Sequence, residues 1–361
     1  MRPPDGSIDL DDLVALERAD PAGMLGIVLG LPEQCRVGYR DGREAPELPS
    51  GEALDAVVVC GMGGSGVSGD VLAALYRDRL GIPIAVVKNP VLPEFCGKDT
   101  LVVCSSYSGT TAETLACFEE ATSRGCRVVA VTAGGTLGRR ARQEDGPVVP
   151  VPEGMTAPRG AIGYLSFGLL GALESMGVIP AIEEEVEECV GVLTRTAATV
   201  AADRPESENP AKSLARAVKD RLVLVWGADG IGAVAAQRWK TQLNENAKVP
   251  AFSSVLPELD HNEVVGWSAG TGERFTLVTL RHEGEHPDVA ARFRATLDVV
   301  AGSGLEHREV RATGGSVMAD LMELVMMGDA ASVYLAYLRG VDPTPIEAIA
   351  RIKRALEGEQ Q

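Results

Sequence analysis

The sequence predicts an α/β protein of two domains, each a sandwich of helices around a central parallel β-sheet. Its 361 residues exceed one ordinary hydrophobic core and suit two domains of similar size. Short, continuously apolar runs, which are typical of strands buried on both faces, alternate with helix-type segments. The alternation restarts in the second half of the chain, so the two halves look like copies of one architecture.

The first half is predicted to form five strands after an N-terminal helix over residues 11–29 and a polar connection over residues 36–52. This divides it into an N-terminal segment, residues 1–50, and a first domain, residues 51–180. Ligands are expected beyond the carboxyl ends of the parallel strands. The predicted strands are residues 56–60, 84–87, 101–104, 128–131 and 148–151.

A second domain is predicted over residues 205–361. An acidic helical stretch, residues 182–202, leads to a polar segment, residues 203–210, that we interpret as the domain boundary. Strands are expected beyond it, and a C-terminal helix follows them. The expected strands are residues 222–226, 275–280 and, with a weaker signal, 307–310, and the helix covers residues 345–356.

Composition indicates a globular protein that binds neither nucleic acid nor membrane. The formal charge of -17 opposes a polyanionic partner, which is normally bound by clustered Lys and Arg. The seven cysteines include no C-x-x-C pair, as expected for reduced thiols in the cytoplasm. The N-terminal residues lack an apolar signal core, and the longest uncharged run, residues 160–173, is too short for a membrane span. We therefore expect a cytoplasmic protein.

The most informative segment is the hydroxyl-rich turn between the strand that ends near Cys104 and the helix that follows it. Free N–H groups and the positive end of the dipole gather at a helix N-terminus, and Ser106, Ser108 and Thr111 add hydroxyl donors. The loop lacks the Lys of a nucleoside triphosphate loop, so one sugar phosphate suits it better than ATP. A simple helix cap is the alternative, but one cap uses fewer hydroxyls. The second half has no counterpart, which predicts one phosphate site per chain.

A glycine-rich turn at residues 61–66 matches G-x-G-x-x-G between a strand and a helix. A dinucleotide site also needs an acidic residue at the end of the next strand, where this chain has Lys88, Asn89 and Pro90. Glycines such as Gly64 still allow close approach of the backbone to a ligand, and Ser65 adds a hydroxyl. We favour contact with a sugar phosphate, and tight-turn packing is the alternative.

Residues 282–286 spell the zinc-protease motif H-E-x-x-H. That chemistry requires a helix, so that both imidazoles share one face. Gly284 within the motif, Pro287 after it and a strand before it predict a loop instead, and we interpret the match as chance. Other acidic, His and Cys residues lack convincing ligand spacing. We therefore expect no metal and no cofactor.

Two polar segments, residues 239–250 and 256–263, carry candidate acid–base groups between apolar anchors. Glu245 lies between two amides with lysines nearby, which is a suitable setting for a general base. His261 titrates near neutral pH and can move protons to and from a hydroxyl. Each residue alone is more often structural than catalytic, and sequence reasoning does not place the two together.

In combination these motifs resemble the bifunctional phosphoglucose/phosphomannose isomerases of archaea and bacteria. The resemblance extends from about Ala56 to Lys353 and implies two SIS (sugar isomerase) domains, flavodoxin-like αβα sandwiches, in a homodimer. It implies interconversion of glucose 6-phosphate and mannose 6-phosphate with fructose 6-phosphate. The segments that carry it are residues 61–66, 106–111, 158–159, 244–252 and 256–263.

The resemblance also implies roles for individual residues. Ser65 looks like a sugar contact, and Ser106, Ser108 and Thr111 are similar to a phosphate clamp. It implies four catalytic residues. Arg159 is similar to a cation that stabilises the enediolate, and Glu245 to the base that moves a proton between C1 and C2. His261 is similar to a ring-opening acid/base from the neighbouring subunit, and Lys353 to a lysine that closes over the site.

Acceptance of both aldoses requires only that the shared enediolate intermediate rotate about its C2–C3 bond. The family resemblance implies a small Thr that leaves the space, and Thr344 is the candidate. Two other functions stay open: an isomerase for another phosphosugar, and a non-catalytic SIS protein that senses a phosphosugar. Glu245 and His261 together favour an enzyme.

Overall fold

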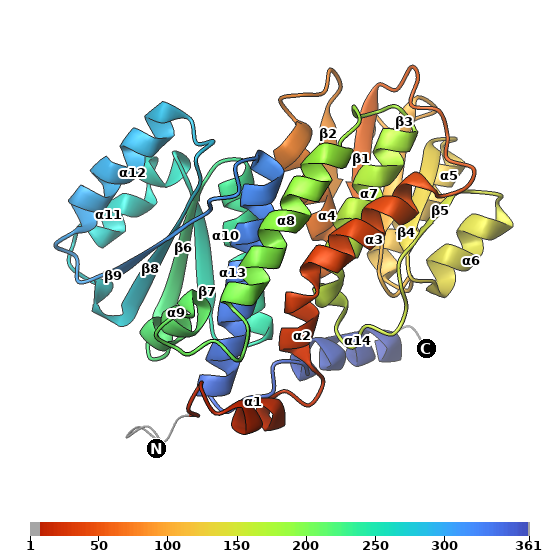
Figure 1. Ribbon diagram of the computed structural model, residues 1–361. Helices are drawn as coiled ribbons and strands as arrows, with labels where there is room; N and C mark the ends of the chain where they lie inside the picture. Colours follow the sequence, from red (N-terminus) through yellow and green to blue (C-terminus); the bar gives the residue numbers. More distant parts are fainter. Residues whose placement is uncertain (1–7, 360–361) are drawn as a thin grey trace.

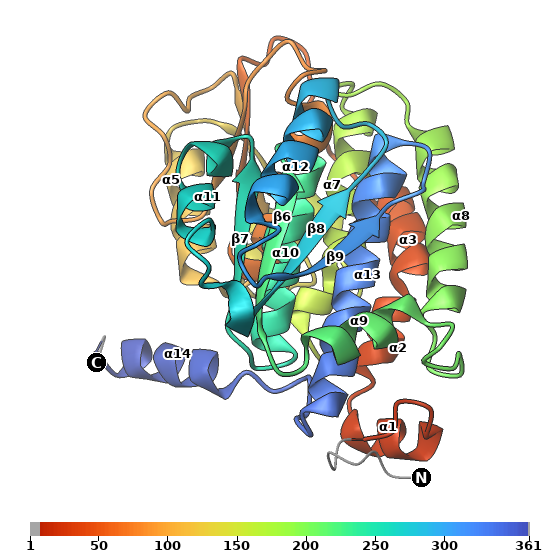
Figure 2. The same ribbon diagram turned by 90° about the vertical axis from the view of Figure 1, so that its left-hand side faces the viewer.

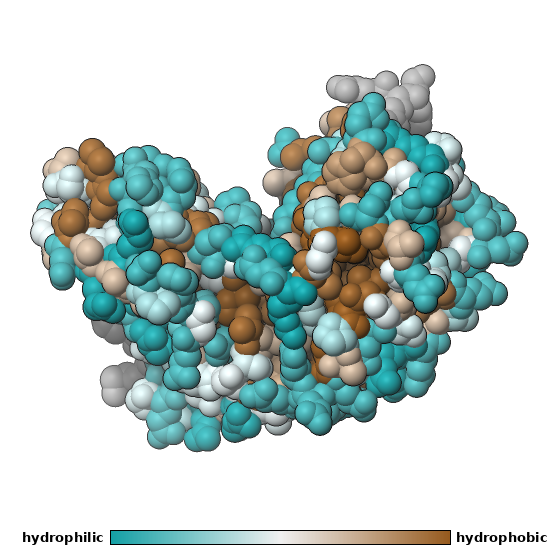
Figure 3. Space-filling view, turned by 90° about the horizontal axis from the view of Figure 1, so that it is seen from above, coloured by the Kyte–Doolittle hydropathy of each residue, from teal (hydrophilic) through white to brown (hydrophobic). Residues whose placement is uncertain are grey.

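The computed structural model describes residues 8–359, and it contains two parallel β-sheets with a layer of long helices between them (Figure 1). The predicted N-terminal segment and second domain include residues 1–7 and 360–361, which lie outside the described part. Seen from above, the two lobes are separated by a hollow with apolar side chains beside it (Figure 3). The predicted α/β class with parallel sheets is confirmed, whereas the exact domain boundaries stay predictions.

The first sheet has the strand order β2-β1-β3-β4-β5, with every neighbouring pair parallel. All five predicted strands form within two residues of their expected ends. The central strands β1 and β3 are buried along their whole length, as continuous apolar runs require. The strands are β1 (Ala56–Cys60), β2 (Ile84–Val87), β3 (Thr100–Ser105), β4 (Arg127–Thr132) and β5 (Val148–Pro150). The helices between and after them are α4 (Gly63–Tyr76), α5 (Ala112–Ser123), α6 (Gly135–Gln143), η1 (Pro158–Ala161) and α7 (Ile162–Ser175).

The second sheet repeats this order as β7-β6-β8-β9. Its edge strand β7 was not predicted, because Phe252 is half exposed and the three residues after it are only partly buried, so the strand is not a continuous apolar run. The strands are β6 (Leu222–Ala228), β7 (Ala251–Leu256), β8 (Phe275–Arg281) and β9 (Glu306–Arg311). Its helices are α9 (Pro210–Val218), α10 (Ile231–Glu245), η2 (Glu258–His261), α11 (Glu263–Trp267), η3 (Gly272–Arg274), α12 (Pro287–Val300), α13 (Val317–Leu338) and α14 (Glu347–Glu359).

The N-terminal segment departs from its prediction in two ways. The single helix expected over residues 11–29 is two helices, α1 (Leu13–Ala19) and α2 (Met24–Leu29), because Asp20 ends the first and its carboxylate accepts the N–H groups of Met24 and Leu25. The polar connection expected over residues 36–52 is wrong in its first part, since α3 (Leu31–Arg43) continues to residue 43. Gly38 lets α3 lie directly on α7, because a Cβ at Gly38 would be 2.9 Å from the Tyr164 Cα.

Two helices cross between the sheets and connect the halves. The predicted acidic helix is α8 (Glu183–Thr199), which packs on both α3 and α13. Among the described residues α13 alone has the length and composition to cross a membrane, but 89% of its apolar window is buried inside the protein, as in a core helix. Helix α14 differs, because it projects from the body and leaves Ile352 and Leu356 exposed (Figure 2).

Candidate active site

The hydroxyl-rich loop follows β3 and leads into α5, as predicted. The Ser106 and Thr111 hydroxyl oxygens lie 3.1 Å apart, and Ser106 Oγ also accepts the N–H of Gly109 at 3.1 Å. Ser108 and Thr110 form a second hydroxyl pair at 3.1 Å. The loop therefore contains two pairs of neighbouring hydroxyl groups, and one of these hydroxyls also accepts a backbone N–H of the loop.

The N-terminus of α5 has no side-chain cap. Thr111 occupies the N-cap position, but its hydroxyl accepts no N–H from the first turn. The alternative interpretation, a Ser/Thr cap and nothing more, is therefore wrong. Uncapped N–H groups at the positive end of a helix dipole, with hydroxyls beside them, form a suitable site for a phosphate.

The glycine-rich turn at the start of α4 connects this loop to the next group of residues. Ser65 Oγ accepts the Tyr107 N–H at 3.0 Å, so the two turns are tied together. On its other side, Gly64 lies against Arg159: a Cβ at Gly64 would be 2.8 Å from the Arg159 Cα. The absence of a side chain at Gly64 thus lets the backbone of Arg159 approach the turn that Ser65 ties to the hydroxyl-rich loop.

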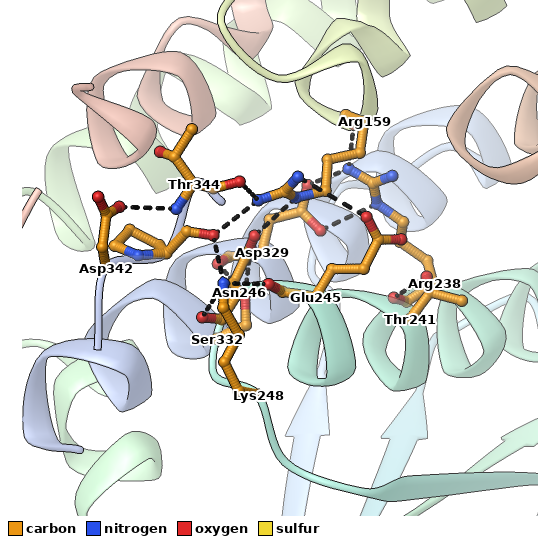
Figure 4. Close-up of polar contacts among 11 residues, drawn as sticks. Arg159, Arg238, Thr241, Glu245, Asn246, Lys248, Asp329, Ser332, Asp342 and Thr344 are labelled. Carbon is orange, nitrogen blue, oxygen red and sulfur yellow. Dashed lines mark hydrogen bonds and ion pairs between the residues drawn. The ribbon is translucent and has the colours of Figure 1, made fainter. Parts of the chain in front are cut away.

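Arg159 lies in η1 and is only 4% exposed (Figure 4). Its Nε donates to Asn246 Oδ1 at 2.8 Å, and Nη2 donates to the carbonyl oxygens of Pro343 and Thr344 at 2.7 and 3.1 Å. Nη1 faces Glu245 Oε2 at 3.7 Å. Among the described residues, Nη1 is the guanidinium nitrogen without a hydrogen-bonded acceptor, so it is the one that can bind an oxyanion.

Glu245 ends α10, and its side chain is 25% exposed, so a carboxylate and a buried cation lie beside each other at the junction of the two halves. Burial lowers the pKa of Arg159 below its usual value, while nearby Glu245 opposes that shift. Such a guanidinium stays charged at neutral pH. The pair unites a proton acceptor with a fixed positive charge, which is what removal of a carbon-bound proton requires.

Lys248 adds a second cation. Its ammonium donates to the carbonyl oxygens of Glu245, Asn246 and Pro343 at 2.6, 3.3 and 3.0 Å. Burial, and then the charge of Arg159, lower the pKa of Lys248 to about 8, against raising effects from Asp342 and Glu245. Lys248 thus joins the end of α10 to the segment that precedes α14.

Of the other predicted residues, the structure places one beside Arg159 and two away from it. Thr344 lies at the group, since its carbonyl accepts from Arg159 and its buried hydroxyl has no hydrogen-bond partner among the described residues. His261, at the end of η2, and Lys353, on α14, are both exposed and form no hydrogen bond or ion pair within the described chain. One chain therefore unites Arg159 with Glu245 and leaves His261 and Lys353 outside.

Sequence reasoning missed the buried groups behind Arg159, namely Asn246, Arg238 and Asp329. Arg238 is 1% exposed and Asp329 3% exposed, and they form a bidentate ion pair. The available signal was one acidic residue within the otherwise apolar end of α13, because a charge in such a helix needs a buried partner. The motif H-E-x-x-H lies between β8 and α12, outside any helix, as expected.

Comparisons with known proteins identify the family of this chain. A family model described as the bacterial phospho-glucose isomerase C-terminal SIS domain matches residues 207–356. A bifunctional phosphoglucose/phosphomannose isomerase of Caldicellulosiruptor bescii is 35% identical over 335 residues, which cover 92% of this chain and 98% of that protein. The chain belongs to the bifunctional phosphoglucose/phosphomannose isomerase family.

A second relative also matches most of the chain, and a solved structure has a similar fold. The family member of Aquifex aeolicus is 35% identical over 303 residues, which cover 83% of this chain and 90% of that protein. A crystal structure of a hypothetical protein from Thermus thermophilus covers 96% of this chain and 94% of its own, with a TM-score of 0.72 and 17% identity. At that identity the structural likeness concerns the fold alone.

The hydroxyl-rich loop, residues 106–111, is named the phosphate loop for the phosphate that we propose it binds. It leads to a direct binding prediction. Replacement of Ser106 by Ala removes the hydroxyl that organises the loop, and we expect about tenfold weaker binding of inorganic phosphate, the loss typical of one charge-assisted hydrogen bond. Isothermal titration calorimetry measures this. Ser123→Ala is the control, because that hydroxyl bonds the Glu120 carbonyl at the opposite end of α5. Equal phosphate affinity in the two variants would contradict the site.

Proposed function

We propose that this protein interconverts glucose 6-phosphate and mannose 6-phosphate with fructose 6-phosphate through ring opening and an enediolate. The observation that carries the proposal is the Glu245 carboxylate beside the buried Arg159 guanidinium, joined through Gly64 and Ser65 to an uncapped phosphate loop. Family membership supports the same reaction.

The phosphate loop acts as the anchor in this mechanism. Ser106, Ser108, Thr111 and the N–H groups of α5 hold the phosphate at one end of the hexose. The other end then reaches Arg159, because the turn at Gly64 and Ser65 lies between the two sites. Fixing the substrate in this way converts the proton transfers into intramolecular steps.

Ring opening exposes the carbonyl on which the reaction depends. A cyclic hexose phosphate holds this carbonyl as a hemiacetal, so a group must move a proton between the ring oxygen and the anomeric hydroxyl. We assign this to His261 of the partner subunit in a homodimer, because His261 of the same chain is exposed and unpaired among the described residues. Lys353 on the projecting α14 is assigned to closure over the site.

Proton transfer then interconverts aldose and ketose. Glu245 removes the C2 proton of the open aldose, electrons move into the carbonyl, and the enediolate oxygen binds Nη1 of Arg159. Return of the proton to C1 gives the ketose. C2 has lost its configuration in the enediolate, so both aldoses share one intermediate. We assign the space for C2–C3 rotation to the region around Thr344.

The proposal includes a cytoplasmic location and neither metal nor cofactor. Among the described residues, no group of three or more His, Cys, Asp or Glu residues is arranged to hold a metal ion. All seven cysteines are free. Arg159 supplies the positive charge that a metal would otherwise provide to the oxyanion.

The first test supplies fructose 6-phosphate and quantifies both aldose products, with and without a chelator. We expect both aldoses and no effect of the chelator. Glu245→Gln removes the base and is expected to lower kcat by about 100-fold or more. Glu174→Gln is the matched control, because Glu174 is another partly buried carboxylate paired with an arginine, Arg43.

Other outcomes of this assay favour the alternative functions. Phosphosugar binding without product from the intact protein would favour a non-catalytic sensor. Turnover of another phosphosugar alone would favour an isomerase of different specificity. A strict requirement for a divalent metal would contradict the mechanism.

A mixing experiment tests whether His261 acts across subunits. Glu245→Gln and His261→Ala are each expected to be inactive, but a mixed dimer contains one site with both native groups. After exchange of subunits, random pairing of two such chains should restore about a quarter of wild-type activity. No recovery, with mixed dimers detected by mass spectrometry, would place both groups in the same chain. An active His261→Ala protein would remove His261 from the reaction.

The lowered pKa of Lys248 predicts an alkaline limit. Lys248 is charged below about pH 8 and neutral above it, so one of its three N–H donors and its positive charge are lost as pH rises. We expect kcat/KM, which reports the free enzyme, to fall above about pH 8. In Lys248→Arg the charge persists, and the fall should move to higher pH. Identical pH profiles for the wild-type protein and Lys248→Arg would show that the charge of Lys248 does not set the alkaline limit.

A further inference from the structure

Arg159 is held from behind by a buried polar network that involves two helices of the second half. Asn246 is completely buried at the end of α10, where its Oδ1 accepts from Arg159 Nε. Its Nδ2 donates to Ser332 Oγ of α13 at 2.8 Å. Ser332 in turn donates to the Asp329 carbonyl at 2.6 Å. Every polar atom of the Asn246 side chain therefore has a fixed partner (Figure 4).

A second contact holds the backbone of Arg159. Arg238 Nη2 donates to the Arg159 carbonyl at 2.8 Å, and the Asp329 carboxylate accepts from Arg238 at 3.0 and 2.7 Å. Arg238 and Asp329 are almost completely buried. An ion pair of this kind costs desolvation, and its geometry specifies a unique position for the groups that it contacts. Here that group is the peptide of Arg159.

Asn246 also directly follows Glu245 in the chain. The same helix end thus presents the carboxylate to one side of the guanidinium and an amide oxygen to another. A neutral acceptor at Nε fixes the guanidinium plane and adds no second carboxylate to the one that Glu245 already supplies. A carboxylate in that position would neutralise the charge that an oxyanion needs.

We propose that Asn246 is a positioning residue that orients Arg159, so that Nη1 faces the developing enediolate next to Glu245. The inference rests on the proposed isomerase function and deepens it. It assigns to Asn246 a contribution to stabilisation of the intermediate and none to binding of the phosphate.

Asn246→Ala tests the assignment with two ligands. A phosphorylated pentonohydroxamate mimics the planar enediolate, whereas sorbitol 6-phosphate has the phosphate and hydroxyls without that charge. We expect about 10- to 100-fold losses in kcat and in affinity for the hydroxamate, because small misplacements of a catalytic group have effects of this size. Affinity for sorbitol 6-phosphate should change by less than about threefold, as expected when the phosphate contacts are kept.

Asn209→Ala is the matched control. Asn209 is also a buried asparagine with three hydrogen bonds, to Ala211, Lys212 and Ala201, but it caps α9. It should lower the melting temperature and keep the wild-type ratio of hydroxamate to sorbitol 6-phosphate affinity. Should Asn246→Ala fail to fold, Ser332→Ala removes the acceptor of Asn246 Nδ2, together with the Ser332 donor to the Asp329 carbonyl, and keeps the Asn246 contact with Arg159. We expect a smaller change of the ratio in the same direction.

The results distinguish this inference from the proposed function. Absence of isomerisation by the wild-type protein would overturn the function itself. With an active wild type, an unchanged affinity ratio in Asn246→Ala, or equal losses for the two ligands, would overturn the positioning role of Asn246.

Discussion

The structure depends on the demand of one buried guanidinium for hydrogen-bond acceptors. A charged side chain that is only 4% exposed is tolerated when its donors are paired, and no single element supplies enough acceptors for Arg159. Its partners come from the end of α10 and from the segment between α13 and α14. Satisfying Arg159 therefore requires η1 of the first half, α10 of the second half and the C-terminal segment to meet at one point.

This requirement explains features of the surrounding fold. Gly64 must lack a side chain because α4 and η1 approach closely there, and the same turn contacts the phosphate loop through Ser65. The Pro343 carbonyl accepts from both Arg159 and Lys248, so two cations fix the base of the projecting α14. The loops at the carboxyl ends of the first sheet and the helix ends of the second half thus become one site, although each belongs to a separate sandwich.

The sequence predicted the parts of the molecule that are determined locally. Continuous apolar runs such as β1 and β3 need no knowledge of distant residues. The turn and helix start after Cys104 are local in the same way, whereas the anion site there stays a prediction. Edge strand β7 and helix α3 were missed because their signals, half-exposed residues and glycines, acquire meaning only from what packs against them. The same applies to Asn246, Arg238 and Asp329: nothing in their own segments indicates that they meet at Arg159.

The two halves differ in the loop at which we propose the phosphate site. Strand β8 occupies in its sheet the place of β3, next to the first strand of its half, but the loop that follows β8 is closed by its own side chains. Glu285 accepts the His282 N–H and the Arg281 guanidinium, and the His286 ring accepts the N–H of Asp288 in the first turn of α12. An internal carboxylate and a ring nitrogen thus take the donors that an anion would need. The loop after β3 lacks both groups, and the helix N-terminus that follows it has no side-chain cap.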